Sequence, residues 1–176
     1  VAVLWLVSLA IGAAILGGPD NRLVALQCVT GLAVLLLAFG VSVQFPVNTR
    51  FTYLLGAVVI LAVLHKSLAA SLANLVEGAR RPSRPPSFGE VLLAGAVLFV
   101  FAWHALGAAL PERFWDPLVV HLYAPAYIKA FGVWDLPPDA GVFAAMPMAV
   151  DLGFSAAFLF GGEAAAHLID LTFFLV

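Results

Sequence analysis

Long apolar runs separated by short clusters of turn-forming residues dominate this chain of 176 residues. The runs from Leu23 to Val43 and from Val91 to Leu110 are the clearest. A helix needs roughly 20 mostly apolar residues to cross the ~30 Å hydrocarbon core of a bilayer, and both runs reach that length. A helix also satisfies its own backbone hydrogen bonds in lipid. The sequence therefore predicts an all-α integral membrane protein, a polytopic bundle of transmembrane helices.

The composition excludes several other classes of protein. Apolar residues make up 64% of the chain and charged residues only 10%, whereas soluble domains are near half apolar and a quarter charged. The net charge of -2 leaves no basic surface for nucleic acid. Cys28 is the single cysteine, so the chain contains neither an internal disulfide nor a cysteine-cluster metal site.

Five full spans and a truncated sixth are expected, all within one domain that covers residues 1–176. The expected apolar segments are 1–16, 23–43, 51–72, 91–110 and 142–160, and the sixth begins near residue 164 after Gly161 and Gly162. The first and last segments are shorter than a full span. We therefore expect the chain to be a fragment or subunit of something larger, with the lipid bilayer and other membrane subunits as its partners.

Charge in the loops predicts the orientation of the chain. The loop 77–90 carries Arg80, Arg81 and Arg84, and an excess of Lys and Arg in short loops is typical of the cytoplasmic side. This loop is therefore predicted to be cytoplasmic, which places the 111–141 loop on the outer side. The same count puts the 44–50 turn outside and Gly161-Gly162 inside.

The 111–141 loop is expected to contain a helix of its own. Asp116 and Pro117 form a good helix start, with Asp as the cap and Pro at the first helical position. Aromatic residues that favour the membrane–water interface follow it, namely Tyr123, Tyr127, Phe131 and Trp134. A short helix lying along the outer surface is the simpler interpretation, and a re-entrant segment that lines a pathway is the alternative.

Asp151 is the most informative single side chain. It lies about halfway along the 142–160 segment, near the expected bilayer midplane, where an acid costs about 2.5–3.5 kcal/mol on insertion scales. Such an acid normally faces protein or a water-filled cavity. Pro147, four residues earlier, is expected to kink the helix, and an acid beside a kink is typical of transporters. The alternatives are a proton or cation site and a protonated Asp that only bonds a neighbouring helix.

Glu163, His167 and Asp170 form a second group of candidate residues. Spacings of four and three residues place them on one helical face. They are candidates for proton transfer and, on a weaker pattern, for binding a divalent metal. Ser71 or Asn74 would then supply a fourth ligand. A helix start at which Glu163 complements the dipole is the simpler interpretation.

Two further histidines, His65 and His104, lie on neighbouring expected helices. Their expected depths below the outer face differ too much for the two axial ligands of one haem, counted at ~1.5 Å per residue. The sequence therefore identifies no cofactor. Lys66 is expected to extend its ammonium group to the cytoplasmic surface.

Three functions fit these residues. The first is an integral membrane component of a transporter, with an acidic proton or cation site at Asp151 and a path that includes Glu163, His167 and Asp170. The second is a non-catalytic structural subunit of a larger membrane complex, in which buried polar groups hold helices together. The third is a metal-dependent intramembrane enzyme. The sparse chemistry favours the first two functions, so an enzyme is the least expected of the three.

Overall fold

A computed structural model describes residues 1–17, 24–80, 85–108, 110, 121–135 and 149–173, apart from the side chains of residues 79, 149, 150, 170, 171 and 173. Seven helices and no strands form these parts of the chain. The helices are α1 (Ala2–Leu16), α2 (Val24–Ser42), α3 (Arg50–Val63), α4 (His65–Arg80), α5 (Phe88–Ala108), α6 (Tyr123–Phe131) and α7 (Ala149–Phe173). The predicted all-α class is confirmed for these residues.

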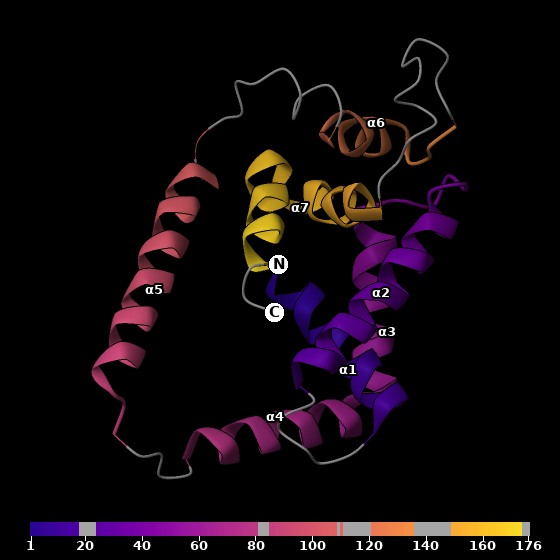
Figure 1. The fold of residues 1–176 in the computed structure, drawn as a ribbon. Helices are drawn as coiled ribbons and strands as arrows, with labels where there is room; N and C mark the ends of the chain where they lie inside the picture. Colours follow the sequence, from indigo (N-terminus) through magenta and orange to yellow (C-terminus); the bar gives the residue numbers. More distant parts are fainter. Residues whose placement is uncertain (18–23, 81–84, 109, 111–120, 136–148, 174–176) are drawn as a thin grey trace.

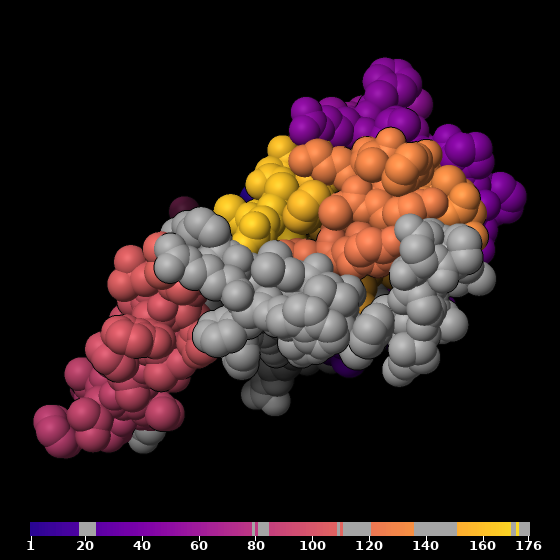
Figure 2. Space-filling view, turned by 90° about the horizontal axis from the view of Figure 1, so that it is seen from above, coloured from indigo at the N-terminus to yellow at the C-terminus, as the bar shows by residue number. Residues whose placement is uncertain are grey.

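The helices form a bundle with a helical layer at each end (Figure 1). Helix α1 packs against α2, α3 and α4. Helix α4 runs across one end of the bundle, while α6 and the first half of α7 lie across the other. Seen from above, α6 covers part of α7, and α5 projects away from the rest of the molecule (Figure 2).

Three helical segments are long and apolar enough to cross a membrane: Val24–Ser42, Phe88–Ala108 and Asp151–Ile169. A fourth span results if the bent pair α3 and α4 is counted as one. Helix α1 has 15 residues and is shorter than a span. The structure therefore supports three to four candidate spans in its described part, and the predicted five full spans with a truncated sixth are not confirmed.

The segment 51–72 is not one straight helix. Helix α3 ends at Val63, and α4 continues from His65 at an angle of 74°. No Pro or Gly stands at the bend; instead the residues after it become polar on one face, which favours a helix that lies along a surface. The ring Nδ1 of His65 lies 2.9 Å from the carbonyl of Ala62, which a continuous helix would have bonded internally.

Helices α1 and α2 are packed at backbone contact. Added to Gly12, a Cβ atom would lie 1.7 Å from the carbonyl oxygen of Gln27, and one added to Gly31 would lie 1.7 Å from that of Ser8. The backbone of each helix therefore lies directly against a glycine of the other helix, and the two helices run antiparallel. Glycine at the contact allows this close approach of two helices in a membrane.

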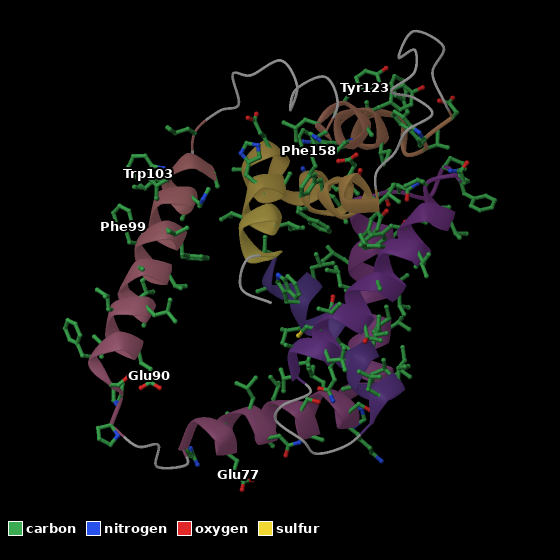
Figure 3. All side chains as sticks on the ribbon, in the orientation of Figure 1. Glu77, Glu90, Phe99, Trp103, Tyr123 and Phe158 are labelled. Carbon is green, nitrogen blue, oxygen red and sulfur yellow. The ribbon has the colours of Figure 1, made fainter. Side chains whose placement is uncertain are left out.

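Buried polar side chains attach α4 to this pair of helices. The Ser71 hydroxyl donates a hydrogen bond of 3.0 Å to the side-chain carbonyl of Gln27, and both residues are almost fully buried. The Ser71 side chain therefore helps to pack α4 against α2. Glu77 lies on the opposite side of α4 and points away from the bundle (Figure 3).

Asn48 joins the turn between α2 and α3 to the segment after α6. Its side-chain amide donates to the carbonyls of Ser42, Phe45 and Gly132 at 2.7–3.0 Å. Its side-chain oxygen accepts from the hydroxyls of Ser42 and Tyr53. The 44–50 turn and the 121–135 segment thus lie at the same end of the molecule, opposite α4.

Helix α7 is broken near its middle. Gly162 has φ 64° and ψ -150°, a combination that is essentially restricted to glycine. The Nε of Arg50 donates to the carbonyl of Leu159, three residues earlier. A cationic donor at the end of a half-helix satisfies a carbonyl that the break frees. The predicted break at Gly161-Gly162 is therefore present as a kink within α7.

This contact corrects one element of the expected topology. Because Arg50 bonds Leu159, the 44–50 turn and the break at Gly162 lie at the same end of the molecule. The prediction that these two turns lie on opposite faces is wrong. The error came from counting 142–160 as an upright span, whereas the first half of α7 lies across the end of the bundle beside α6 (Figure 1).

Replacement of Gly162 by alanine is expected to destabilise the protein by about 1–3 kcal/mol, because alanine is strained at these backbone angles. The thermal unfolding midpoint of the purified protein in detergent measures this effect. Gly95→Ala is the matched control, since a Cβ at Gly95 meets nothing within 4 Å. A Gly162→Ala variant as stable as Gly95→Ala would contradict the assigned break.

Candidate functional site

The strongest candidate site is a buried carboxylate paired with a histidine. Asp151 lies in the first turn of α7 and its side chain is 3% exposed. The Nδ1 of His121, just before α6, lies 3.0 Å from Asp151 Oδ1, and the His121 side chain is 34% exposed. The pair thus connects a buried acid to a partly accessible imidazole.

The local sequence explains why an acid is tolerated at this position. The first turn of a helix has unpaired backbone N–H groups and a positive dipole end, which stabilise a carboxylate. The hydroxyl of Ser155 donates to the backbone carbonyl of Asp151 at 2.8 Å, one turn further along. This bond involves the backbone of Asp151, whereas the contact with His121 involves its carboxylate.

A buried apolar cluster lies beside this pair. Leu152 and Ala156 on α7 pack into one buried cluster with Val43 at the end of α2 and with Ile128 on α6. Above them, Trp134 is 2% exposed and lies edge-on to Tyr123 and Tyr127. These ring contacts join α6 to the segment that follows it, and His121 lies two residues before α6.

A second contact between α6 and α7 lies on the same interface. The ammonium of Lys129 is 5.0 Å from the centre of the Phe158 ring, which is within cation–π range. Phe158 is on the first half of α7, close to α6 (Figure 3). The position of His121 relative to Asp151 therefore depends on the interface between α6 and the first half of α7.

The location of Asp151 differs from the one expected from sequence. Asp151 is in the first turn of α7, and the next residue, Leu152, packs against Gly40 near the end of α2. The acid is thus close to the α6 end of the bundle rather than halfway along a span. Pro147, the expected cause of a kink, lies outside the described residues, as does the expected helix start at Asp116 and Pro117.

Sequence reasoning did not identify His121. It is 30 residues from Asp151, so no helical or strand spacing connects the two. The one signal was a titratable residue among the aromatic side chains of the 111–141 loop. The aromatic residues themselves were read correctly as part of a short helix, since α6 carries Tyr123, Tyr127 and Phe131.

The second group of candidate residues lies on the other half of α7 from Asp151. Glu163 and His167 are half-buried on the second half of α7, beyond the break, and the side chain of Asp170 is outside the described part. Among the side chains that the structure describes, no three His, Cys, Asp or Glu residues are grouped as metal ligands. Ser71, a suggested fourth ligand, bonds Gln27 instead. Metal binding by the three residues stays a prediction.

The comparisons with other proteins give no further guide to this site. No protein-family model, curated protein or solved structure matches the chain. The geometry of His121 and Asp151, together with the broken helix that carries Asp151, is therefore the basis for any functional assignment.

Proposed function

We propose that the chain is an integral membrane component of a transporter, in which Asp151 and His121 form a proton- or cation-handling site. The observation that carries the proposal is the 3.0 Å contact between a nearly inaccessible carboxylate and a partly exposed imidazole. Histidine changes its charge between about pH 5 and 8, unlike other unperturbed side chains. A carboxylate next to it can accept the proton that the imidazole releases.

The backbone around the site supports the same proposal. Secondary transporters commonly bind substrates and ions at discontinuous helices, whose ends present free backbone groups. Here α7, the helix that carries Asp151, is interrupted at Gly162. Asp151 stands at the beginning of the interrupted helix, where the dipole favours an anion.

The proton transfer proposed within the pair has two steps. A proton enters the exposed imidazole of His121 at Nε2, and the proton on Nδ1 passes to Oδ1 of Asp151. The histidine ends neutral, with its proton on Nε2, and the aspartate ends protonated. Transfer of that proton to an acceptor farther along α7, for which Glu163 and His167 are the candidates, followed by a tautomer change of His121, returns the pair to its first state.

The proposed placement in the membrane follows from the arginines of the 77–90 loop. We place this loop on the cytoplasmic side and the 111–141 loop, with His121, on the outer side, as the positive-inside rule favours. The bilayer and other membrane subunits are the proposed partners. The site would then take its proton from the outer side rather than hold it at the bilayer midplane.

Proton flux into vesicles tests the proposal. The purified protein is reconstituted into liposomes that contain a pH-sensitive dye, a potassium diffusion potential drives protons inward, and the rate of internal acidification is recorded. The wild-type protein is expected to raise this rate above that of protein-free vesicles. Asp151→Asn is expected to return it to the protein-free rate, and His121→Gln is expected to slow it.

Asp135→Asn is the matched control. Asp135 is exposed and accepts a hydrogen bond from the Tyr127 hydroxyl, which an asparagine oxygen can also accept. This variant should keep the wild-type flux. Wild-type flux in Asp151→Asn would refute the assigned site, and the carboxylate would then be a packing group.

A structural subunit is the second candidate function, and α5 is the observation that favours it. This helix has no buried residue along its 21 residues, and Phe99 and Trp103 point away from the rest of the molecule (Figure 3). Helices of this kind face lipid or a neighbouring subunit. A wild-type protein that conducts no protons would favour this candidate over the transporter.

A further inference from the structure

A partly enclosed cavity of about 480 Å³ lies between α1, α2, α3 and α7. This volume is within the range of small-molecule sites. The lining is almost entirely hydrocarbon and includes Val7, Leu35, Phe39, Ala57, Ile60 and Ile169. The cavity is separate from the carboxylate of Asp151, which is not among its lining residues.

The few polar residues of the lining offer no free hydroxyl to an occupant. The Ser42 and Tyr53 hydroxyls both donate to the side-chain oxygen of Asn48, at 3.0 and 2.8 Å. The Thr52 hydroxyl lies 2.9 Å from that of Thr49. An occupant of the cavity would therefore gain by burying apolar surface and not by hydrogen bonding within it.

A cationic group lies beside one end of the cavity. Arg50 is the first residue of α3, two residues before the lining residue Thr52. Its Nε donates to the carbonyl of Leu159, next to the lining residue Phe160. Arg50 is exposed. Within the described part of the chain, its two terminal nitrogens make no hydrogen bond. The guanidinium can therefore bind a phosphate as a bidentate donor.

We propose that this cavity binds an acyl chain of a membrane lipid with a net negative head group, and that Arg50 binds the head-group phosphate. The apolar lining and the adjacent cation together match an amphiphile with one anionic end. The cavity is bounded by the candidate spans α2 and α7 and by the bent pair that includes α3, so a lipid chain can reach it within the bilayer.

Gly56 provides a way to fill the cavity without disturbing Arg50. It lines the cavity, and a Cβ added to it meets nothing within 4 Å. A leucine at this position would place its side chain in the space proposed for the acyl chain. Gly95 on α5 also has nothing within 4 Å of an added Cβ but lies outside the lining, so Gly95→Leu is the matched control.

Native mass spectrometry of the full chain in detergent, titrated with dioleoyl phosphatidylglycerol or dioleoyl phosphatidylcholine, tests the proposal. The wild-type protein is expected to retain one phosphatidylglycerol and to bind phosphatidylcholine more weakly. Gly56→Leu is expected to lose the retained lipid, while Gly95→Leu keeps it. Arg50→Gln is expected to weaken phosphatidylglycerol binding at least about tenfold, because a neutral amide replaces the charged bidentate donor.

Three results would overturn the proposal. Equal wild-type affinity for the two lipids would show that no anionic head group is recognised. Retention of phosphatidylglycerol by Gly56→Leu would show that the chain lies outside the cavity. Displacement of the lipid by inorganic phosphate alone would show that the cation, without an acyl chain, accounts for binding. Arg50→Gln removes the bond to Leu159 and could therefore impair folding. Gly56→Leu keeps that bond, so lipid retention by Gly56→Leu tests the cavity independently.

Discussion

Gly31→Ala is expected to lower the stability of the protein by about 3 kcal/mol or more, near or above the upper end of the usual cost of overpacking. The new Cβ would lie 1.7 Å from the backbone carbonyl oxygen of Ser8. A side chain could rotate away, but a helix backbone cannot, so α1 must move as a unit. Ser8 is fully buried in this contact, and the movement would also disrupt the reciprocal contact of Gly12 with Gln27.

Thermal unfolding of the purified protein in detergent measures this effect, and a fall of about 10 °C in the midpoint is expected for a chain of this size. Gly40→Ala is the control on the same helix, since its Cβ would make an ordinary contact of 3.5 Å with the Leu152 side chain. If the two variants unfold at the same temperature, α1 and α2 do not pack at backbone contact.

Asn48→Asp is expected to have the second large effect on stability. The side-chain amide of Asn48 faces the three carbonyl oxygens of Ser42, Phe45 and Gly132, and Asn48 is 2% exposed. An aspartate would place a carboxylate oxygen against those acceptors and lose every donor. Each buried group left unpaired costs about 1–3 kcal/mol, and a charged group costs more.

The expected outcome is release of the segment after α6 from the turn between α2 and α3. Amide hydrogen exchange at residues 132–134 should then speed up strongly in Asn48→Asp, together with a fall in the unfolding midpoint. Gln44→Glu makes the same change of charge in the same turn at an exposed position and should leave both measurements near the wild-type values. Unchanged exchange in Asn48→Asp would disprove this role of the side chain.

Local sequence patterns predicted some features of the fold because those features depend on neighbouring residues alone. The run 23–43 is apolar enough to predict α2, and the run 91–110 is apolar enough to predict most of α5. The break at Gly162 was also predicted locally, since two successive glycines commonly interrupt a helix. Asp151 was also identified from one position, because an acid in an apolar run is rare.

The tertiary structure decided which residues meet. His121 pairs with Asp151, Arg50 with Leu159, and Asn48 with Gly132. These partners are 30, 109 and 84 residues apart along the chain, and no helical period extends over such distances. The sequence also did not predict the bend between α3 and α4. An apolar run followed by a polar one fits either one straight span or a span followed by a helix that lies along a surface.

The sequence by itself determined the all-α class, the apolar character of the main segments and the presence of one costly buried acid, since these follow from composition and local periodicity. The three-dimensional packing decided the depth of that acid, its histidine partner and the position of the first half of α7 across the end of the bundle. The physical reason is that the free energy of burying a residue in an apolar helix depends on that residue and its sequence neighbours. The relative placement of the helices depends instead on contacts between side chains and backbones that are distant in the sequence.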